Sequence, residues 1–317
     1  MEHEDFIEYR NKVYELYLQG RYSEALEIAE KAHTRFGDEA SRTSYWLACF
    51  NSLLHKEDKA IEILTNSLGD GVWWSPKMLE GEKDLDPLRN REEFKRIVER
   101  CWGIFEEKRK ESKPEKLVFY PDTFDREKKY PLFVALHWKG GNMQEFSKYW
   151  KHVLERGYIL LVPQSSQLSG SEAYCWDDWE KAKKEVTDHI AEIRDRHNLI
   201  EDGIVIAGAS QGASLGIIDL VLEDTPLNLR RFIVVVPPID DVSFFIPLLK
   251  NGVRKGVKGY ILAGEKDRFA KNTEELCSEM EKAGLQYKLT VVKGLGHGFP
   301  SDFDVYLDEA LDYVEAK

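Results

Sequence analysis

The chain has 317 residues, of which 42% are hydrophobic and 32% charged, with 22 glycines and 11 prolines. This composition excludes collagen-like, low-complexity and intrinsically disordered chains. The 57 acidic and 45 basic residues give a formal net charge of −12, which disfavours nucleic acid as a partner because its phosphates repel an acidic surface.

Several features favour a cytoplasmic protein without a membrane span. The longest apolar runs, residues 158–163 and 232–239, are shorter than the roughly 18 residues that a spanning helix needs. The chain starts with the acidic segment MEHED, unlike the basic and then apolar start of a signal peptide. The cysteines lie far apart, without CxxC pairs or zinc-site spacing, which favours free thiols in a reducing compartment and no metal. They are Cys49, Cys101, Cys175 and Cys277.

The first 110 residues or so are expected to be all helical. Apolar residues recur there at spacings of three and four, the pattern of successive amphipathic helices. The groups cover residues 13–17, 26–32, 46–54 and 61–68. Breaks at Gly20, Gly37 and the polar stretch 56–58 separate these groups, and Gly69 follows the last one. A further helix is expected near residues 91–107.

Two segments of this region resemble each other. The segment GRYSEAL, which starts at Gly20, is followed by small residues at Ala29 and Ala32, and DKAIEIL at Asp58 falls in step about 35 residues later. His55 stands where the first unit has its turn glycine. The pair resembles tetratricopeptide repeats, and a generic array of helical hairpins is the alternative. The resemblance implies a helical domain, residues 1–112, that could bind a protein partner or mediate self-association.

The pattern changes after the charged segment 108–116, which contains Pro114 and marks the expected boundary between domains 1–112 and 113–317. Short apolar, β-branched runs then alternate with helical stretches. Continuous apolar strands indicate burial on both faces, so we predict an α/β domain with a mostly parallel sheet flanked by helices. The runs cover residues 117–120, 132–136, 158–162, 204–207, 232–236, 260–262 and 287–292.

The segment Gly208-Ala209-Ser210-Gln211-Gly212 directly follows one of these strands and opens an apolar helix. That context is typical of a nucleophile elbow, a turn so tight that only small residues fit two positions before and after the serine. We therefore predict that Ser210 is a nucleophile at a helix N-terminus.

A nucleophilic serine needs a histidine as its base and an acidic residue that orients the histidine. In folds with such an elbow, the acidic residue follows the serine in the chain, and the histidine comes after the acidic residue. His297, in the loop GLGHGF, is the one histidine after Ser210. Asp267 follows the strand run 260–262 and is the favoured acid, with Glu265, Asp240 and Asp241 as competitors.

The loop His137-Trp138-Lys139-Gly140-Gly141 leaves an early strand. Its backbone can supply an N–H group that completes an oxyanion hole with the N–H of Gln211. His137 is expected to order this loop. Further along, Trp176-Asp177-Asp178-Trp179 is expected to begin a helix, where acidic residues are favourable, and Trp176 either packs or lines a substrate pocket.

These elements, in this order, resemble the α/β-hydrolase superfamily over about residues 117–314, and most closely its phospholipase/carboxylesterase branch. Trp138 stands where that branch usually has glycine, so Lys139 is the second oxyanion donor by position and Trp138 stays an alternative. The resemblance implies a serine hydrolase of carboxylic esters that acts on a small-molecule substrate, with the triad Ser210, Asp267 and His297 and no cofactor. A peptidase using the same triad, or a non-catalytic scaffold built on the helical domain, is the alternative.

Overall fold

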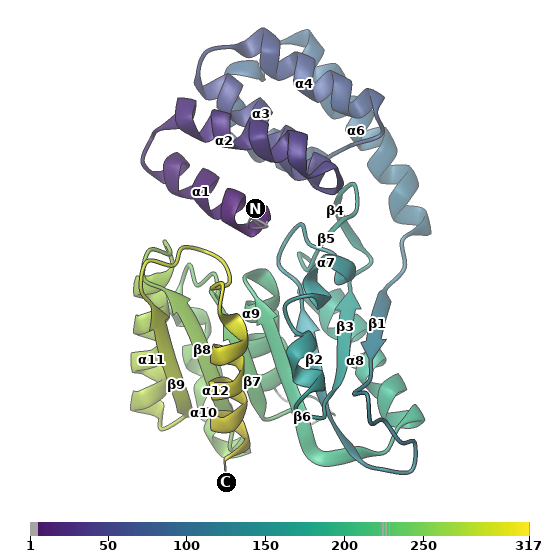
Figure 1. Ribbon diagram of the computed structural model, residues 1–317, viewed down its shortest axis with the longest axis vertical. Coiled ribbons are helices and arrows are strands. Elements are labelled where there is room, and N and C mark those ends of the chain that lie inside the picture. The colour runs from purple at the N-terminus through teal and green to yellow at the C-terminus, as the bar shows by residue number, and fades with distance from the viewer. Residues whose placement is uncertain (1–5, 224, 226, 228, 317) are drawn as a thin grey trace. The chain divides into compact units, whose positions relative to one another are not determined.

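The computed structural model describes residues 6–223, 225, 227 and 229–316 and separates into two units. The helical unit contains the chain up to Ser112 together with Leu168–Ala173. The sheet unit contains Lys113–Gln167 and the chain from Tyr174 onwards. Figure 1 shows the order of the elements in both.

The predicted helices of the first 110 residues are confirmed. Ala25, Ala29 and Ala32 on α2 are fully buried. Their small side chains let neighbouring helices approach α2 closely. Gly20 and His55 both adopt the left-handed backbone conformation, with φ of 69° and 57°, so the two turns are conformationally alike. The resemblance to tetratricopeptide repeats itself stays a prediction. The elements are α1 (Phe6–Leu18), α2 (Tyr22–Arg35), η1 (Gly37–Glu39), α3 (Ala40–Leu53), α4 (Glu57–Gly69), α5 (Pro76–Gly81), η2 (Lys83–Leu88) and α6 (Glu92–Glu111).

The tip of a hairpin that no sequence pattern predicted belongs to the helical unit, and the two ends of the hairpin belong to the sheet unit. The hairpin consists of β4 (Gln167–Gly170) and β5 (Ala173–Cys175). Its tip bonds to the segment before α5: Ser171 N–H donates to the Trp73 carbonyl at 2.9 Å, and Trp73 N–H donates to Ser171 Oγ at 2.8 Å. A Cβ on Gly170 would lie 3.0 Å from the Trp73 carbonyl oxygen, so this contact favours glycine. The chain therefore passes from the sheet unit into the helical unit and back within a few residues.

The sheet unit contains one seven-stranded sheet in the order β1-β3-β2-β6-β7-β8-β9, seen side by side in Figure 1. Strand β1 pairs antiparallel with β3, and all other neighbours are parallel, so the predicted mostly parallel sheet is confirmed. Each predicted apolar run overlaps one of the strands, to within one residue at its ends. They are β1 (Glu115–Phe119), β2 (Tyr130–Leu136), β3 (Ile159–Gln164), β6 (Leu199–Ala209), β7 (Arg231–Val235), β8 (Lys258–Gly264) and β9 (Gln286–Val292).

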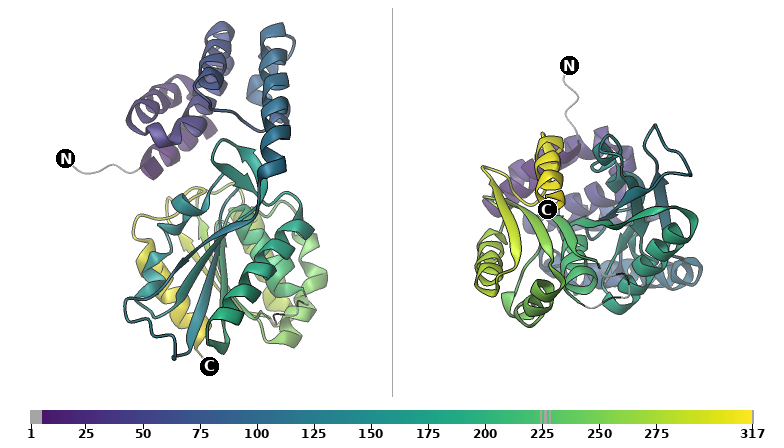
Figure 2. Two further views of the ribbon diagram at one scale, coloured as in Figure 1. Left: turned by 90° about the vertical axis from the view of Figure 1, so that its right-hand side faces the viewer. Right: turned by 90° about the horizontal axis from the view of Figure 1, so that it is seen from below.

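Helices cover both faces of this sheet, as the left panel of Figure 2 shows. One apolar layer packs against α8 (Trp179–Arg196), α9 (Gln211–Leu215), the π-helical Gly216–Leu222, α10 (Ile246–Lys255) and α11 (Ala270–Ala283). The other packs against α7 (Met143–Ser147), η3 (Lys151–Leu154) and α12 (Phe303–Glu315). The short helix η5 (Val242–Phe244) precedes α10. With both faces covered, the strands are buried as their continuous apolar character predicts.

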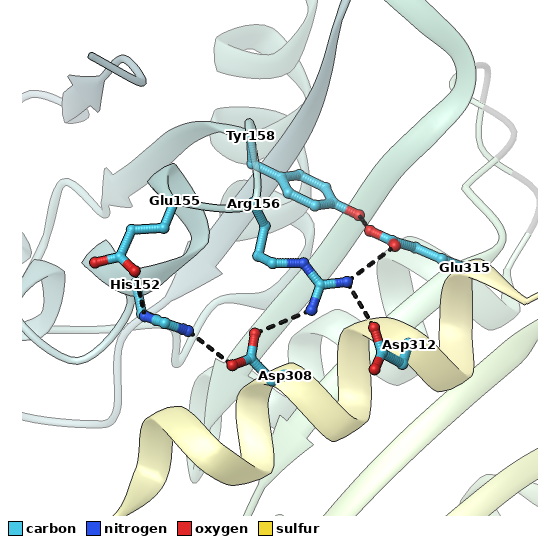
Figure 3. A network of polar contacts seen from close by, with 7 residues as sticks. All are labelled: His152, Glu155, Arg156, Tyr158, Asp308, Asp312 and Glu315. Carbon is cyan, nitrogen blue, oxygen red and sulfur yellow. Dashed lines mark hydrogen bonds and ion pairs between the residues drawn. The ribbon is translucent and has the colours of Figure 1, made fainter. Parts of the chain in front are cut away.

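Helix α12 is held by a polar network, shown in Figure 3. The Arg156 guanidinium donates to Asp308 at 3.0 Å and to Asp312 at 2.6 Å, and it lies 3.4 Å from Glu315. Tyr158 donates to Glu315 at 2.5 Å, and His152 Nε2 lies 3.0 Å from Asp308. Arg156 therefore links the end of η3 to three successive turns of α12.

No helix in the described residues is long and apolar enough to cross a membrane. All four cysteines are buried, and none of them forms a disulfide. Burial raises the pKa of each thiol, to about 12 for Cys175 and Cys277, so these groups stay protonated and weakly reactive at neutral pH.

Candidate active site

Ser210 occupies a strained turn between β6 and α9. Its φ of 52° and ψ of −124° lie in a region that side chains other than glycine rarely adopt. The turn leaves no room for a side chain two positions before or two positions after Ser210. A Cβ on Gly208 would lie 2.7 Å from Gly212, and a Cβ on Gly212 would lie 2.2 Å from the Leu136 carbonyl oxygen. This is the backbone geometry that the Gly-Ala-Ser-Gln-Gly pattern predicts.

The structure brings together the three residues predicted as nucleophile, acid and base. The Ser210 Oγ lies 2.8 Å from His297 Nε2, and His297 Nδ1 lies 2.8 Å from Asp267 Oδ2. The Asp267 side chain is 3% exposed and also accepts the N–H of Phe269 at 3.1 Å, so its carboxylate is fixed in place. The His297 side chain is 24% exposed, which leaves the ring accessible beside Ser210.

The loops after β8 and β9 meet closely, which places Asp267 against His297. A Cβ on Gly264 would lie 2.3 Å from the Gly296 carbonyl oxygen, so the close approach requires glycine. Glu265, a competing carboxylate in the sequence, accepts the N–H of Gly294 at 2.8 Å and so holds the histidine loop from its other end.

The remaining competitors lie on the loop after β7. Asp241 accepts the N–H of Ser243 at 2.8 Å and caps η5, and the backbone carbonyl of Asp240 accepts a bond from Asn272 at 3.0 Å. Among the four acidic candidates, the bond to His297 is made by Asp267.

His137 and Trp138 form the base of the loop after β2. His137 is fully buried, and this burial lowers the pKa of its imidazole to about 4, so the ring is neutral. Its Nδ1–H donates to the Trp138 carbonyl at 2.8 Å. The positive φ of this loop falls on Gly140, at 77°, while Trp138 keeps an ordinary backbone conformation. The bulky Trp138 therefore fits at the position where the phospholipase/carboxylesterase branch, which the sequence resembles, usually has glycine.

Of the two alternatives for Trp176, packing and lining a substrate pocket, the structure shows packing. Its side chain is fully buried, stacked on the His137 ring with centroids 4.5 Å apart, and its indole N–H donates to the His137 carbonyl at 2.8 Å. The indole therefore supports the loop from within the core. The Trp176 side chain belongs to the apolar layer that also contains Leu136, at the end of β2.

Aromatic side chains surround Trp138. The Tyr149 ring stacks on Phe299 at 4.4 Å, and both contact the Trp138 ring, at 5.3 and 6.1 Å. Phe299 lies two residues beyond His297, so this cluster links the β2 loop to the histidine loop. The sequence pattern did not single out Tyr149 or Phe299, because residues 149 and 299 are brought together only by the fold.

The sequence analysis also did not identify the contact that Asp177 makes with the elbow. Of the two consecutive aspartates before α8, Asp178 is the N-cap, since its side chain accepts the N–H of Lys181. Asp177 instead bonds to Gln211 Nε2 at 2.7 Å. The sequence could have indicated this contact, because a helix has one N-cap residue and the other of two consecutive aspartates is then available for another partner.

The sheet unit has the fold of the α/β hydrolases, with a serine elbow after β6 and the acid and histidine loops after β8 and β9. Residues 5–111 match the family model described as "A/B hydrolase-like, N-terminal domain". No curated protein matches the chain.

Among solved structures, an uncharacterized protein from Bacillus cereus ATCC 10987 is 26% identical, covers 98% of both chains and has a TM-score of 0.56. Both units therefore have counterparts in it. Esterase PE8 (15% identity, TM-score 0.51) covers 63% of this chain and is itself covered completely. A ferulic acid esterase has 19% identity and a TM-score of 0.53, and the match covers 64% of this chain and 92% of the esterase chain. At these identities the two esterases show the fold of the sheet unit.

The described residues contain no group of three or more side chains that could together hold a metal ion.

Proposed function

We propose that the protein is a serine hydrolase that cleaves carboxylic esters. The observation that carries this proposal is the chain of two 2.8 Å contacts from Ser210 Oγ through His297 to Asp267. His297 accepts the serine proton as Ser210 attacks the ester carbonyl, then donates it to the leaving alcohol. Asp267 holds the imidazole in the tautomer with the proton on Nδ1. Water resolves the acyl-enzyme by the same route.

The developing oxyanion needs N–H donors, for which we propose the backbone groups of Gln211 and Lys139. Gln211 is the first residue of α9, so its N–H is free of intrahelical bonds. The His137 carbonyl oxygen would lie 2.6 Å from a Cβ on Gly212, so it faces the elbow. Because a trans peptide directs its N–H opposite to its carbonyl, the Trp138 N–H points away from the elbow, which supports Lys139 over Trp138.

The similarity of the sheet unit to two solved esterases and the aromatic cluster beside His297 support a small-molecule ester as substrate. We further propose that the helical unit, as the repeat resemblance implies, binds a protein partner or a second copy. Four buried cysteines that form no disulfide support a reducing compartment such as the cytoplasm.

The test is to treat the protein with a fluorophosphonate and to locate the adduct by mass spectrometry. We expect a label on Ser210, turnover of short p-nitrophenyl esters, and a loss of several orders of magnitude in kcat for Ser210→Ala with unchanged folding. An unlabelled Ser210 in a folded protein that hydrolyses no ester would instead favour the scaffold. Cleavage of peptide bonds at a higher kcat/KM than esters would favour the peptidase.

A further inference from the structure

One carboxylate ties together the side chains of both residues proposed as oxyanion donors. Asp177 Oδ1 accepts from Gln211 Nε2 at 2.7 Å. The same carboxylate accepts from Lys139 Nζ, at 2.8 Å to Oδ1 and 2.9 Å to Oδ2. Gln211 lies on the elbow after β6 and Lys139 on the loop after β2, so Asp177 bridges two separate segments.

The backbone around Asp177 makes the same connection. The N–H of Trp176 donates to Gln211 Oε1 at 2.9 Å, so both polar atoms of the Gln211 amide are held by neighbouring residues. On the other side, Gly140 N–H donates to the Tyr174 carbonyl at 2.8 Å, and Tyr174 N–H donates to the Gly141 carbonyl at 2.9 Å. We call residues 174–177 the strap. It fixes the position of the β2 loop relative to the elbow.

The charge of Asp177 needs compensation for this arrangement to serve catalysis. A carboxylate near a developing oxyanion repels it, and the Lys139 ammonium neutralises that charge. Burial of the Asp177 carboxyl raises its pKa, but the hydrogen bonds from Lys139 and Gln211 outweigh burial and hold the pKa below its ordinary value. The Asp177 carboxylate is therefore ionised at neutral pH, although about half of each side chain in its ion pair with Lys139 is exposed.

We infer that Asp177 is a positioning residue of this site: it aligns the backbone N–H groups of Gln211 and Lys139 through their side chains, with Lys139 cancelling its charge. The inference rests on the proposed function and names the device that orients its oxyanion donors. In this role Asp177 acts through its bonds to Gln211 and Lys139.

The first test compares Asp177→Ala with the wild type on a p-nitrophenyl ester. We expect kcat to fall by about tenfold with KM little changed, because misaligned donors weaken transition-state binding more than substrate binding. The inhibition constant of an arylboronic acid, which forms a tetrahedral adduct on serine, should rise by about the same factor. Titration of the serine with fluorophosphonate corrects every rate for the fraction of folded sites.

The control is Asp188→Ala. Asp188 is likewise an exposed aspartate in an ion pair, 2.6 Å from Lys184 on α8, and lies away from the strap. It should leave kcat and the boronate inhibition constant unchanged.

A second test separates positioning from plain structural support. Lys139→Met removes the ammonium and leaves the Asp177 carboxylate uncompensated, so kcat should fall. Adding Asp177→Asn to Lys139→Met removes that charge while the Asn oxygen can still accept from Gln211 Nε2. The double variant should therefore be several times more active than Lys139→Met alone, a recovery that lost support does not produce.

The outcomes distinguish this inference from the proposed function. A wild type that neither reacts with fluorophosphonate nor hydrolyses esters overturns the proposed function. An active wild type, with Asp177→Ala equal to Asp188→Ala or with no recovery in the double variant, overturns the positioning role alone.

Discussion

At the scale of single residues, the elbow depends on a glycine that admits no side chain. In Gly212→Ala the new Cβ would lie 2.2 Å from the Leu136 carbonyl oxygen, and backbone cannot yield as a flexible side chain does. We expect a loss of about 3 kcal/mol in the free energy of unfolding and of nearly all activity, measured by urea denaturation and ester turnover. Gly103→Ala is the matched control.

Gly103 lies exposed inside α6, and a Cβ there meets nothing within 4 Å. Gly103→Ala should stabilise the protein by about 0.5–1 kcal/mol, because alanine loses less backbone entropy in a helix. Equal effects of the two substitutions would show that the close approach at Gly212 is not a constraint.

His137 should make stability depend on pH. Burial lowers the pKa of the folded ring from 6.5 to about 4, so the unfolded chain binds a proton that the folded one does not. The sign follows: stability is full above about pH 6.5 and decreases by up to about 3 kcal/mol as pH falls to about 4. In His137→Asn, whose Nδ2 can still donate to the Trp138 carbonyl, the decrease should be smaller by about this amount. Urea denaturation of both proteins between pH 7 and pH 4.5 measures it, and parallel curves would contradict the prediction.

The sequence identified the residues of the serine–histidine–aspartate chain because their chemistry restricts the choice. Ser210 sits in a pattern that a tight turn requires, and His297 is the one histidine after it. Asp177 and Trp176 could not be assigned in this way. Their partners Gln211 and His137 are 34 to 39 residues away, and no local pattern encodes such a contact.

At the scale of elements, the strands were predictable because burial on both faces leaves a continuous apolar run. The β4–β5 hairpin was not, because its segment QLSGSEAYC is short and mostly polar. The hairpin is stabilised by its hydrogen bonds to Trp73 and Ser75, which lie roughly a hundred residues earlier in the chain. A local sequence pattern does not reveal bonds to such distant residues.

Helix α12 should depend on Arg156. The guanidinium side chain is 28% exposed and contacts three carboxylates on α12, so Arg156→Met leaves these like charges without their shared cation. We expect a loss of about 1 kcal/mol in the free energy of unfolding, smaller in 1 M salt because the partners are partly exposed. Faster amide exchange in α12 should accompany it.

Lys184→Met is the control for Arg156→Met, since Lys184 makes one ion pair with Asp188 and both side chains are largely exposed. It should cost less than about 0.5 kcal/mol. A loss for Arg156→Met that is no larger, or one insensitive to salt, would argue that the network adds nothing to the stability of α12.

At the scale of the whole molecule, the chain crosses between the two units three times: after Ser112, after Gln167 and after Ala173. The last crossing leads directly into the strap that begins at Tyr174. Unfolding the helical unit releases the hairpin tip from Trp73 and so frees the N-terminal end of the strap. The helical unit is thereby connected through the chain itself to the residues that hold Gln211 and Lys139.

Activity should therefore be lost together with the helical unit during denaturation. In a urea titration, hydrogen exchange read by mass spectrometry follows each unit, and ester turnover is measured at the same concentrations. Leu26→Ala empties a buried position of α2, far in sequence from the strap, and should lower the midpoints of helical-unit unfolding and of inactivation equally. Leu311→Ala, fully buried on α12, should lower the midpoint of sheet-unit unfolding and leave the midpoint of helical-unit unfolding unchanged. Turnover that continues at urea concentrations where the helical unit exchanges freely would mean that the hairpin does not support the site, since the strap would then keep Gln211 and Lys139 in place without its anchor.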